Sequence, residues 1–143
     1  MSPAHLLALY LAQNNVGTFG GSAKWSISVS REPVDPPEAV TLYDTGGEGP
    51  DTDELDLLGP TIQVRVRGPN YVEAYAKHEA IRDLLILDQP ITVTPEGAAV
   101  PAEFIGIVMQ SDILAIGRDD SDRHLLTANY RATKVRNAAE GAS

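Results

Sequence analysis

The clearest pattern of apolar and polar positions in this chain runs from residue 61 to residue 67, where the two kinds of residue alternate. This period of two predicts a strand with one buried face. The apolar positions are Ile62, Val64 and Val66. Arg65 and Arg67 therefore share the opposite face, which we expect to be exposed.

A helix is expected directly after this strand. Gly68-Pro69-Asn70 interrupts the alternation, and Asn70 with Glu73 three residues later has the spacing of a capping box. From Tyr71 to Leu85 the apolar residues follow the helical period, with His78 expected to be partly buried and hydrogen-bonded.

Further elements are expected on both sides of this unit. Ser2 and Pro3 have the pattern of an N-cap and a first helical position, so a short helix should run from there to about Asn14. Residues 16–21 are expected to form a flexible connection. Additional strands are predicted at residues 24–30, 40–43, 91–94, 104–110 and 125–133.

This order of elements predicts one α+β domain over residues 1–136, followed by a disordered tail at 137–143. The expected sheet is mainly antiparallel, has five to six strands, and is flanked by the N-terminal helix and the central helix. A length of 143 residues suits a single core.

An acidic loop is expected between the second and third of the main strands, over residues 45–59. It contains no basic residue, and its acidic members are Glu48, Asp51, Asp53, Glu54 and Asp56. These carboxylates are possible ligands for a hard cation. An EF-hand needs a ligand at position 55 and a glycine at position 56, where the chain has Leu55 and Asp56, so a solvated or partner-facing loop is favoured over a metal site.

Composition narrows the function classes. Hydrophobic residues make up 43% of the chain and its net charge is −9, which indicates a globular protein and argues against a broad surface for gripping nucleic acid. No apolar run reaches the ~20 residues of a membrane span, and no secretory signal is recognised. The chain has no cysteine, so disulfides, thiolate nucleophiles and cysteine-based metal sites are excluded.

No catalytic motif is found either. The glycine-rich segment at residues 17–22 lacks the spacing of a phosphate-binding loop, and the three histidines lack zinc-site spacing. We therefore predict no catalytic, cofactor-binding or metal-binding residues and a protein that is not an enzyme. A metal-dependent hydrolase that uses the acidic loop is kept as the least favoured alternative.

Residues 117–124 mix both signs of charge just before the last strand. Two interpretations stay open. Asp and Ser side chains favour a solvated hairpin turn. Alternatively, Arg118, Asp119 and Arg123 make charge-assisted contacts with a neighbouring subunit.

Several segments together resemble the bacteriophage minor capsid and tail terminator (tail completion) proteins. They are residues 41–47, 60–68, 71–85 and 117–131. The resemblance implies a small structural subunit of the virion that forms a ring, with sixfold symmetry as the expectation. Such a ring caps the tail tube, stops its polymerisation and presents a surface to the head.

The resemblance also implies partners and a location. These are other copies of the chain, the major tail tube protein and a head-tail connector, at the head-proximal end of a tail that is assembled in the host cytoplasm. DNA would pass through the ring without specific binding, and no membrane is involved. The alternative within the same class is a head completion or connector protein.

Two groups of residues are the candidate contact sites. Arg65, Arg67, Arg118, Asp119 and Arg123 are candidates for the subunit or partner interface, and the acidic loop is the candidate for facing the lumen or a partner. Because substitutions on an exposed strand face usually cost little stability, replacing Arg65 and Arg67 with Glu should leave the monomer folded and weaken assembly.

Overall fold

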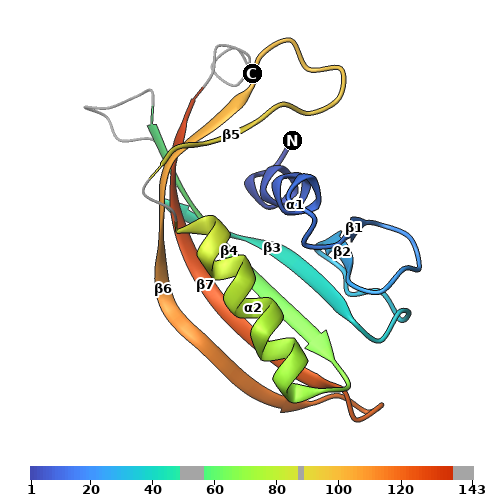
Figure 1. Ribbon diagram of the computed structural model, residues 1–143. Coiled ribbons are helices and arrows are strands. Elements are labelled where there is room, and N and C mark those ends of the chain that lie inside the picture. Colours follow the sequence, from blue (N-terminus) through green and yellow to red (C-terminus); the bar gives the residue numbers. More distant parts are fainter. Residues whose placement is uncertain (49–56, 87–88, 137–143) are drawn as a thin grey trace.

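In the computed structural model, residues 1–48, 57–86 and 89–136 are described, and they form one seven-stranded sheet with two helices (Figure 1). The fold is therefore α+β. Along the chain the elements are α1 (Pro3–Gln13), β1 (Thr18–Phe19), β2 (Ser26–Val29), β3 (Ala39–Glu48), β4 (Leu57–Gly68), α2 (Tyr71–Leu85), β5 (Ile91–Val93), β6 (Ala102–Arg118) and β7 (His124–Val135).

The sheet has the strand order β1-β2-β3-β4-β7-β6-β5 and is mixed. The pairs β1–β2 and β2–β3 are parallel, and the other pairs are antiparallel. The expectation of five to six mainly antiparallel strands is thus wrong in strand number and in the first two pairings.

The short length of β2 permits its parallel pairing with β3. Parallel neighbours usually need a crossover of a dozen or more residues. β2 has only four residues, so the chain must travel back about 13 Å at ~3.3 Å per residue before β3 can begin. Residues 30–38 can span that distance without a helix.

Both helices pack on the same face of the sheet. Residues opposite one another in β3, β4 and β7 are paired in register, so their buried side chains form one layer, which we call the covered face. It consists of Val40, Leu42, Ile62, Val64, Val66, Leu126, Ala128 and Tyr130. Leu7 and Leu11 of α1 and Ile81 of α2 complete the same core.

The sheet curls around the helices. α1 contacts β1, β2 and β3 at one end of the sheet and also β5 at the other end. The long strands β6 and β7 bend visibly along their length (Figure 1). The curl follows from the twist of long strands and from the register shifts of β6 on β7.

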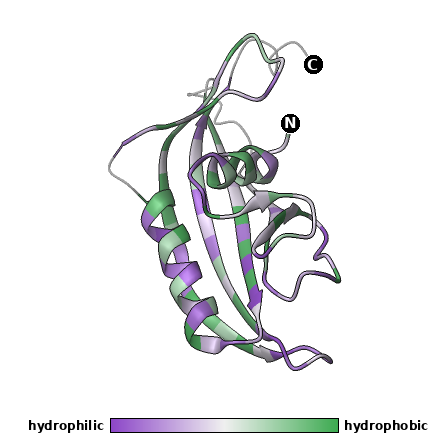
Figure 2. Cartoon of the chain, turned by 45° about the vertical axis from the view of Figure 1, so that its right-hand side comes forward, coloured by the Kyte–Doolittle hydropathy of each residue, from purple (hydrophilic) through white to green (hydrophobic). Residues whose placement is uncertain are grey.

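Local sequence signals set the N-terminal ends of both helices as predicted. The Ser2 hydroxyl accepts a hydrogen bond from the His5 N–H at 3.2 Å, and the Asn70 side chain accepts one from the Glu73 N–H at 3.0 Å. α2 shows its hydrophobic side toward the sheet and its hydrophilic side away from it (Figure 2). The covered face buries this apolar side.

Three predicted boundaries differ in the structure. Residues 45–48 and 57–59 belong to β3 and β4, so they extend a hairpin and do not form a loop. β6 continues to Arg118, eight residues beyond the predicted end at residue 110. Thr18 and Phe19 form the short strand β1 within the expected flexible connection. Residues 49–56 and the tail 137–143 lie outside the described residues.

Candidate functional site

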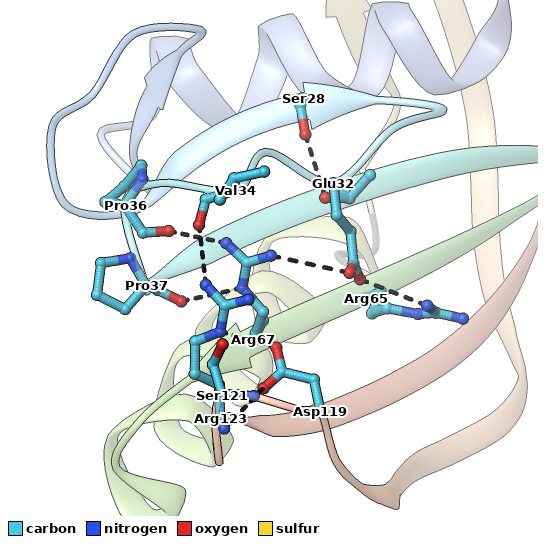
Figure 3. Close-up of polar contacts among 11 residues, drawn as sticks. Ser28, Glu32, Val34, Pro36, Pro37, Arg65, Arg67, Asp119, Ser121 and Arg123 are labelled. Atoms are coloured by element: carbon cyan, nitrogen blue, oxygen red, sulfur yellow. Dashed lines mark hydrogen bonds and ion pairs between the residues drawn. The ribbon is translucent and has the colours of Figure 1, made fainter.

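In the described part of the chain the second face of the sheet carries no helix, and it holds two of the five candidate interface residues, Arg65 and Arg67. We call it the helix-free face; it consists of Thr41, Tyr43, Gln63, Arg65, Arg67, Thr127, Asn129 and Arg131, whose positions alternate with those of the covered face. Residues 30–38 fold over the part of this face that includes Arg67 (Figure 3).

Arg67 holds residues 30–38 in place through hydrogen bonds to two of their backbone carbonyl oxygens. Its Nε donates to the Pro37 carbonyl oxygen at 3.1 Å, and its Nη2 donates to that of Pro36 at 2.8 Å. The side chain is only 3% exposed. Burial, and then the nearby Arg123, lower the pKa of Arg67 from its ordinary value, while Glu32 opposes the shift. Arg67 is thus a structural anchor, and the expectation that it is exposed is wrong.

Glu32 joins the two strand arginines. Its carboxylate lies 3.4 Å from Arg65 Nη1 and 3.9 Å from Arg67 Nη1. Arg65 also lies over the ring of Tyr43, with its guanidinium carbon 5.5 Å from the ring centre. Burial, and then the charge of Glu32, raise the pKa of Tyr43. Arg65 therefore shares a face with Arg67 as predicted, but it is partly engaged within the subunit.

The β6–β7 turn is built around Asp119. Its Oδ1 accepts hydrogen bonds from the N–H groups of Ser121 and Arg123, and its Oδ2 accepts one from Arg123 Nε at 2.7 Å. Burial alone would raise the pKa of Asp119, but the hydrogen bonds from Arg123 and Ser121 outweigh it and lower that pKa. The hairpin-turn interpretation of residues 117–124 is therefore confirmed.

Arg123 also connects this turn to the segment above Arg67. Its Nη1 donates to the Val34 carbonyl oxygen at 2.8 Å. Figure 3 shows Arg67 and Arg123 side by side beneath the same segment. Four of the five candidate interface residues, namely Arg65, Arg67, Asp119 and Arg123, thus belong to one polar cluster.

Arg118 is the most exposed of the five candidates. It pairs with Asp122 at 2.9 Å, and the two side chains are 58% and 79% exposed. Such an exposed pair contributes little to stability, so Arg118 is free to change partners. A contact of Arg118 or Arg123 with another subunit remains a prediction.

The acidic candidates are largely outside the described residues. Glu48 is the last residue of β3, and Asp51, Asp53, Glu54 and Asp56 lie in the segment that the structure does not describe. Over the ranges 1–48, 57–86 and 89–136, no group of three or more His, Asp or Glu side chains is arranged to hold a metal ion. Within those ranges no helix is long and apolar enough to cross a membrane.

The histidines have separate environments. His78, a residue of α2, is fully buried, more completely than predicted, and its Nε2 lies 3.2 Å from the Val64 carbonyl oxygen. His5 stacks on Phe19, and His124 meets the ring of Tyr71 edge-on. Each histidine thus contacts a different set of residues.

Two features of the site were not predicted from the sequence. One is the role of Glu32 and of the carbonyl groups of residues 34–37 as partners of the arginines. Three prolines within residues 33–37 were a signal for it, because a proline-rich segment has few N–H groups and its carbonyls need donors from elsewhere. The other is the long exposed edge of β6.

A comparison with known families identifies the chain as a structural virion protein of a bacteriophage tail. The model of a family described as bacteriophage tail terminator protein matches residues 10–136. The chain belongs to this family, as its sequence resemblance suggested. No curated protein matches the chain.

Proposed function

We propose that this chain is a tail terminator that forms a ring on the tail tube, stops tube polymerisation and provides the surface to which the head is joined. The observation that carries the proposal is the family match, which extends from within α1 to the residue after β7. It thus includes the whole sheet and both of the faces described above.

The helix-free face supports a role in docking. One face of the sheet is used for the core, whereas the other presents polar side chains from β3, β4 and β7. The hydrogen bonds of Arg67 and Arg123 to backbone carbonyls and the Arg123–Asp119 ion pair hold residues 30–38 and the β6–β7 turn in fixed positions. A surface whose side chains are already ordered loses less conformational entropy on binding. The tail tube end and the head connector are the partners that we propose for this face.

The charge of the chain supports passage of DNA through the ring. A net charge of −9 repels phosphate groups, so a lumen lined by this protein would not retain DNA. We propose that the acidic segment from Glu48 to Asp56 lies toward that lumen or toward a partner.

The decisive experiment removes the protein from an assembling phage and examines the particles by electron microscopy. Tails longer than those of the wild type indicate a terminator, because tube growth is then unrestricted. Tails of normal length beside full, unjoined heads would instead assign the chain to a connector. Normal joined particles would contradict both roles.

A further inference from the structure

The outer edge of β6 is exposed over most of its length. β6 has 17 residues, and β7 pairs with it on one side. On the other side β5 pairs only with residues 102–104. In the described part of the chain, residues 105–118 therefore have no second strand beside them. Their outward N–H and C=O groups are available to another strand.

Four of the exposed side chains along this edge are large and apolar. The exposed fractions are 45% for Ile105, 53% for Val108, 60% for Leu114 and 44% for Ile116. No charged residue and no proline occurs between Glu103 and Asp112. Charges and prolines are the usual protection of a free edge against pairing with other chains. Residues 106–109 also pair with β7 without a register shift, so this part of β6 is regular enough to accept a neighbour.

The same sheet has a second free edge on β3. β2 pairs with β3 only from Ala39 to Leu42, whereas β3 continues to Glu48. Residues 43–48 therefore lack a strand on that side within the described ranges. Because β3 and β6 lie on opposite sides of the central pair β4–β7, one copy can offer each edge to a different neighbour.

We propose that residues 106–109 of β6 pair with residues 43–48 of β3 in a second copy of this chain. The contact is heterologous, since each copy contributes a different edge, and repetition of such a contact closes into a ring when the rotation permits. The inference rests on the proposed function, because this contact joins the subunits of the ring.

Charge favours a second copy as the occupant. Arg131 lies opposite Val108 and is exposed, and within the described residues it has no ion pair. Residues 43–48 of β3, in contrast, include the acidic residues Asp44 and Glu48 and no basic one. The pairing thus brings a basic flank next to an acidic one, whereas two β6 edges together would place Arg131 near its own copy.

A charge on the free edge tests the proposal. Val108→Lys places an ammonium group on the strand edge, and Val72→Lys, on α2, is the matched control at a residue that is 75% exposed. Size-exclusion chromatography with light scattering should show oligomers for the wild type and for Val72→Lys and monomers for Val108→Lys. Circular dichroism checks that all three are folded. A wild type that is monomeric at every soluble concentration, or a Val108→Lys variant that assembles normally, overturns the proposal.

Cysteine pairing tests which edges meet. The chain has no cysteine of its own, so two single-cysteine variants can be mixed and oxidised without background. Variants with Val108→Cys should form disulfides with variants carrying Tyr43→Cys or Thr45→Cys, and not with a Val72→Cys control. Disulfides between two Val108→Cys chains alone would show a symmetric β6–β6 contact and would overturn the β3 assignment.

The test of the edge contact and the test of the terminator role can fail independently of each other. If Val108→Lys assembles normally and tails still have wild-type length, the edge assignment fails and the terminator role stands. If Val108→Lys is monomeric in solution and tails grow too long in its presence, both are supported. If loss of the whole protein leaves tail length unchanged, the terminator role fails whatever the edge does.

Discussion

At the scale of single residues, two arginines with the same sequence pattern have different roles. Arg65 and Arg67 lie two residues apart on one strand face, but only Arg67 lies under residues 30–38. Its guanidinium has replaced water with carbonyl oxygens and Glu32. The Glu substitution at position 67 is therefore now expected to disrupt the fold, which corrects the expectation that the doubly substituted monomer stays folded.

Arg67→Ala should lower the free energy of unfolding by about 3 kcal/mol, because it leaves the buried carbonyl of Pro36 and the carbonyl of Pro37 without their donor and removes one of the two arginines that face Glu32. Arg65→Ala, at a side chain that is 29% exposed, should cost about 0.5–1 kcal/mol. Urea unfolding followed by circular dichroism measures both. Equal losses for the two variants would contradict the assignment of Arg67 as the anchor.

His78 should make stability depend on pH. Burial lowers its pKa below the ordinary value of 6.5, and its hydrogen bond with the Val64 carbonyl only partly offsets this. The unfolded chain therefore binds the proton more readily, so the stability from neutral His78 is complete above about pH 6.5 and decreases as the pH falls. The slope approaches about 1.4 kcal/mol per pH unit.

His78→Gln keeps an N–H donor for Val64 and removes the titration. Free energies of unfolding measured for both proteins between neutral and mildly acidic pH should converge as the pH falls, because only the wild type loses this contribution. Parallel curves for the two proteins would show that His78 does not titrate in this way.

At the scale of elements, the β3–β4 hairpin depends on two adjacent glycines. Gly46 and Gly47 both have a positive φ, of 91° and 93°, next to a register shift in β3. A Cβ on Gly46 would meet no other atom within 4 Å. A Cβ on Gly47 would collide with the Gly59 carbonyl oxygen and lie 2.7 Å from the Thr61 nitrogen. A substitution at Gly46 thus tests backbone strain alone, whereas a substitution at Gly47 tests backbone strain together with steric overlap.

Gly46→Ala should cost about 1–2 kcal/mol from the left-handed backbone alone. Gly47→Ala should cost clearly more, since the hairpin backbone must also move. Thermal unfolding of the two variants beside the wild type gives the comparison. A smaller loss for Gly47→Ala than for Gly46→Ala would show that the two strands are not held at this distance.

At the scale of the whole molecule, the curled sheet and the acidic charge decide which surfaces of the protein are available for contacts with other molecules. The helices occupy one face, the polar cluster orders the other, and a long strand edge stays uncovered in the described part of the chain. The helix-free face and the β6 edge are therefore the surfaces on which assembly is proposed.

The protein should not bind DNA at physiological salt, because its net charge of −9 repels phosphate groups. Gel mobility of a double-stranded fragment should be unchanged when the protein is added at the concentrations used for assembly. A shift that weakens with added salt would indicate a basic contact surface, with Arg118 and Arg131 as the first residues to replace.

The sequence by itself determined the family, the α+β class, both helices with their caps, and the alternation of β4. These depend on contacts between residues close in the chain, such as Asn70 with Glu73, or on a period that one strand repeats. The turn around Asp119 belongs to the same group, because its side chain binds backbone groups only two and four residues away.

Only the tertiary structure decided the strand order, the burial of Arg67 and the free edge of β6. Arg67 donates hydrogen bonds to carbonyl oxygens of residues that are 30 and 31 positions away in the chain. A local sequence pattern does not predict which distant segment will cover a polar face of a sheet. The extent of β6 escaped prediction for a related reason: its bulges on β7 break the period of two, so pairing continued where alternation stopped.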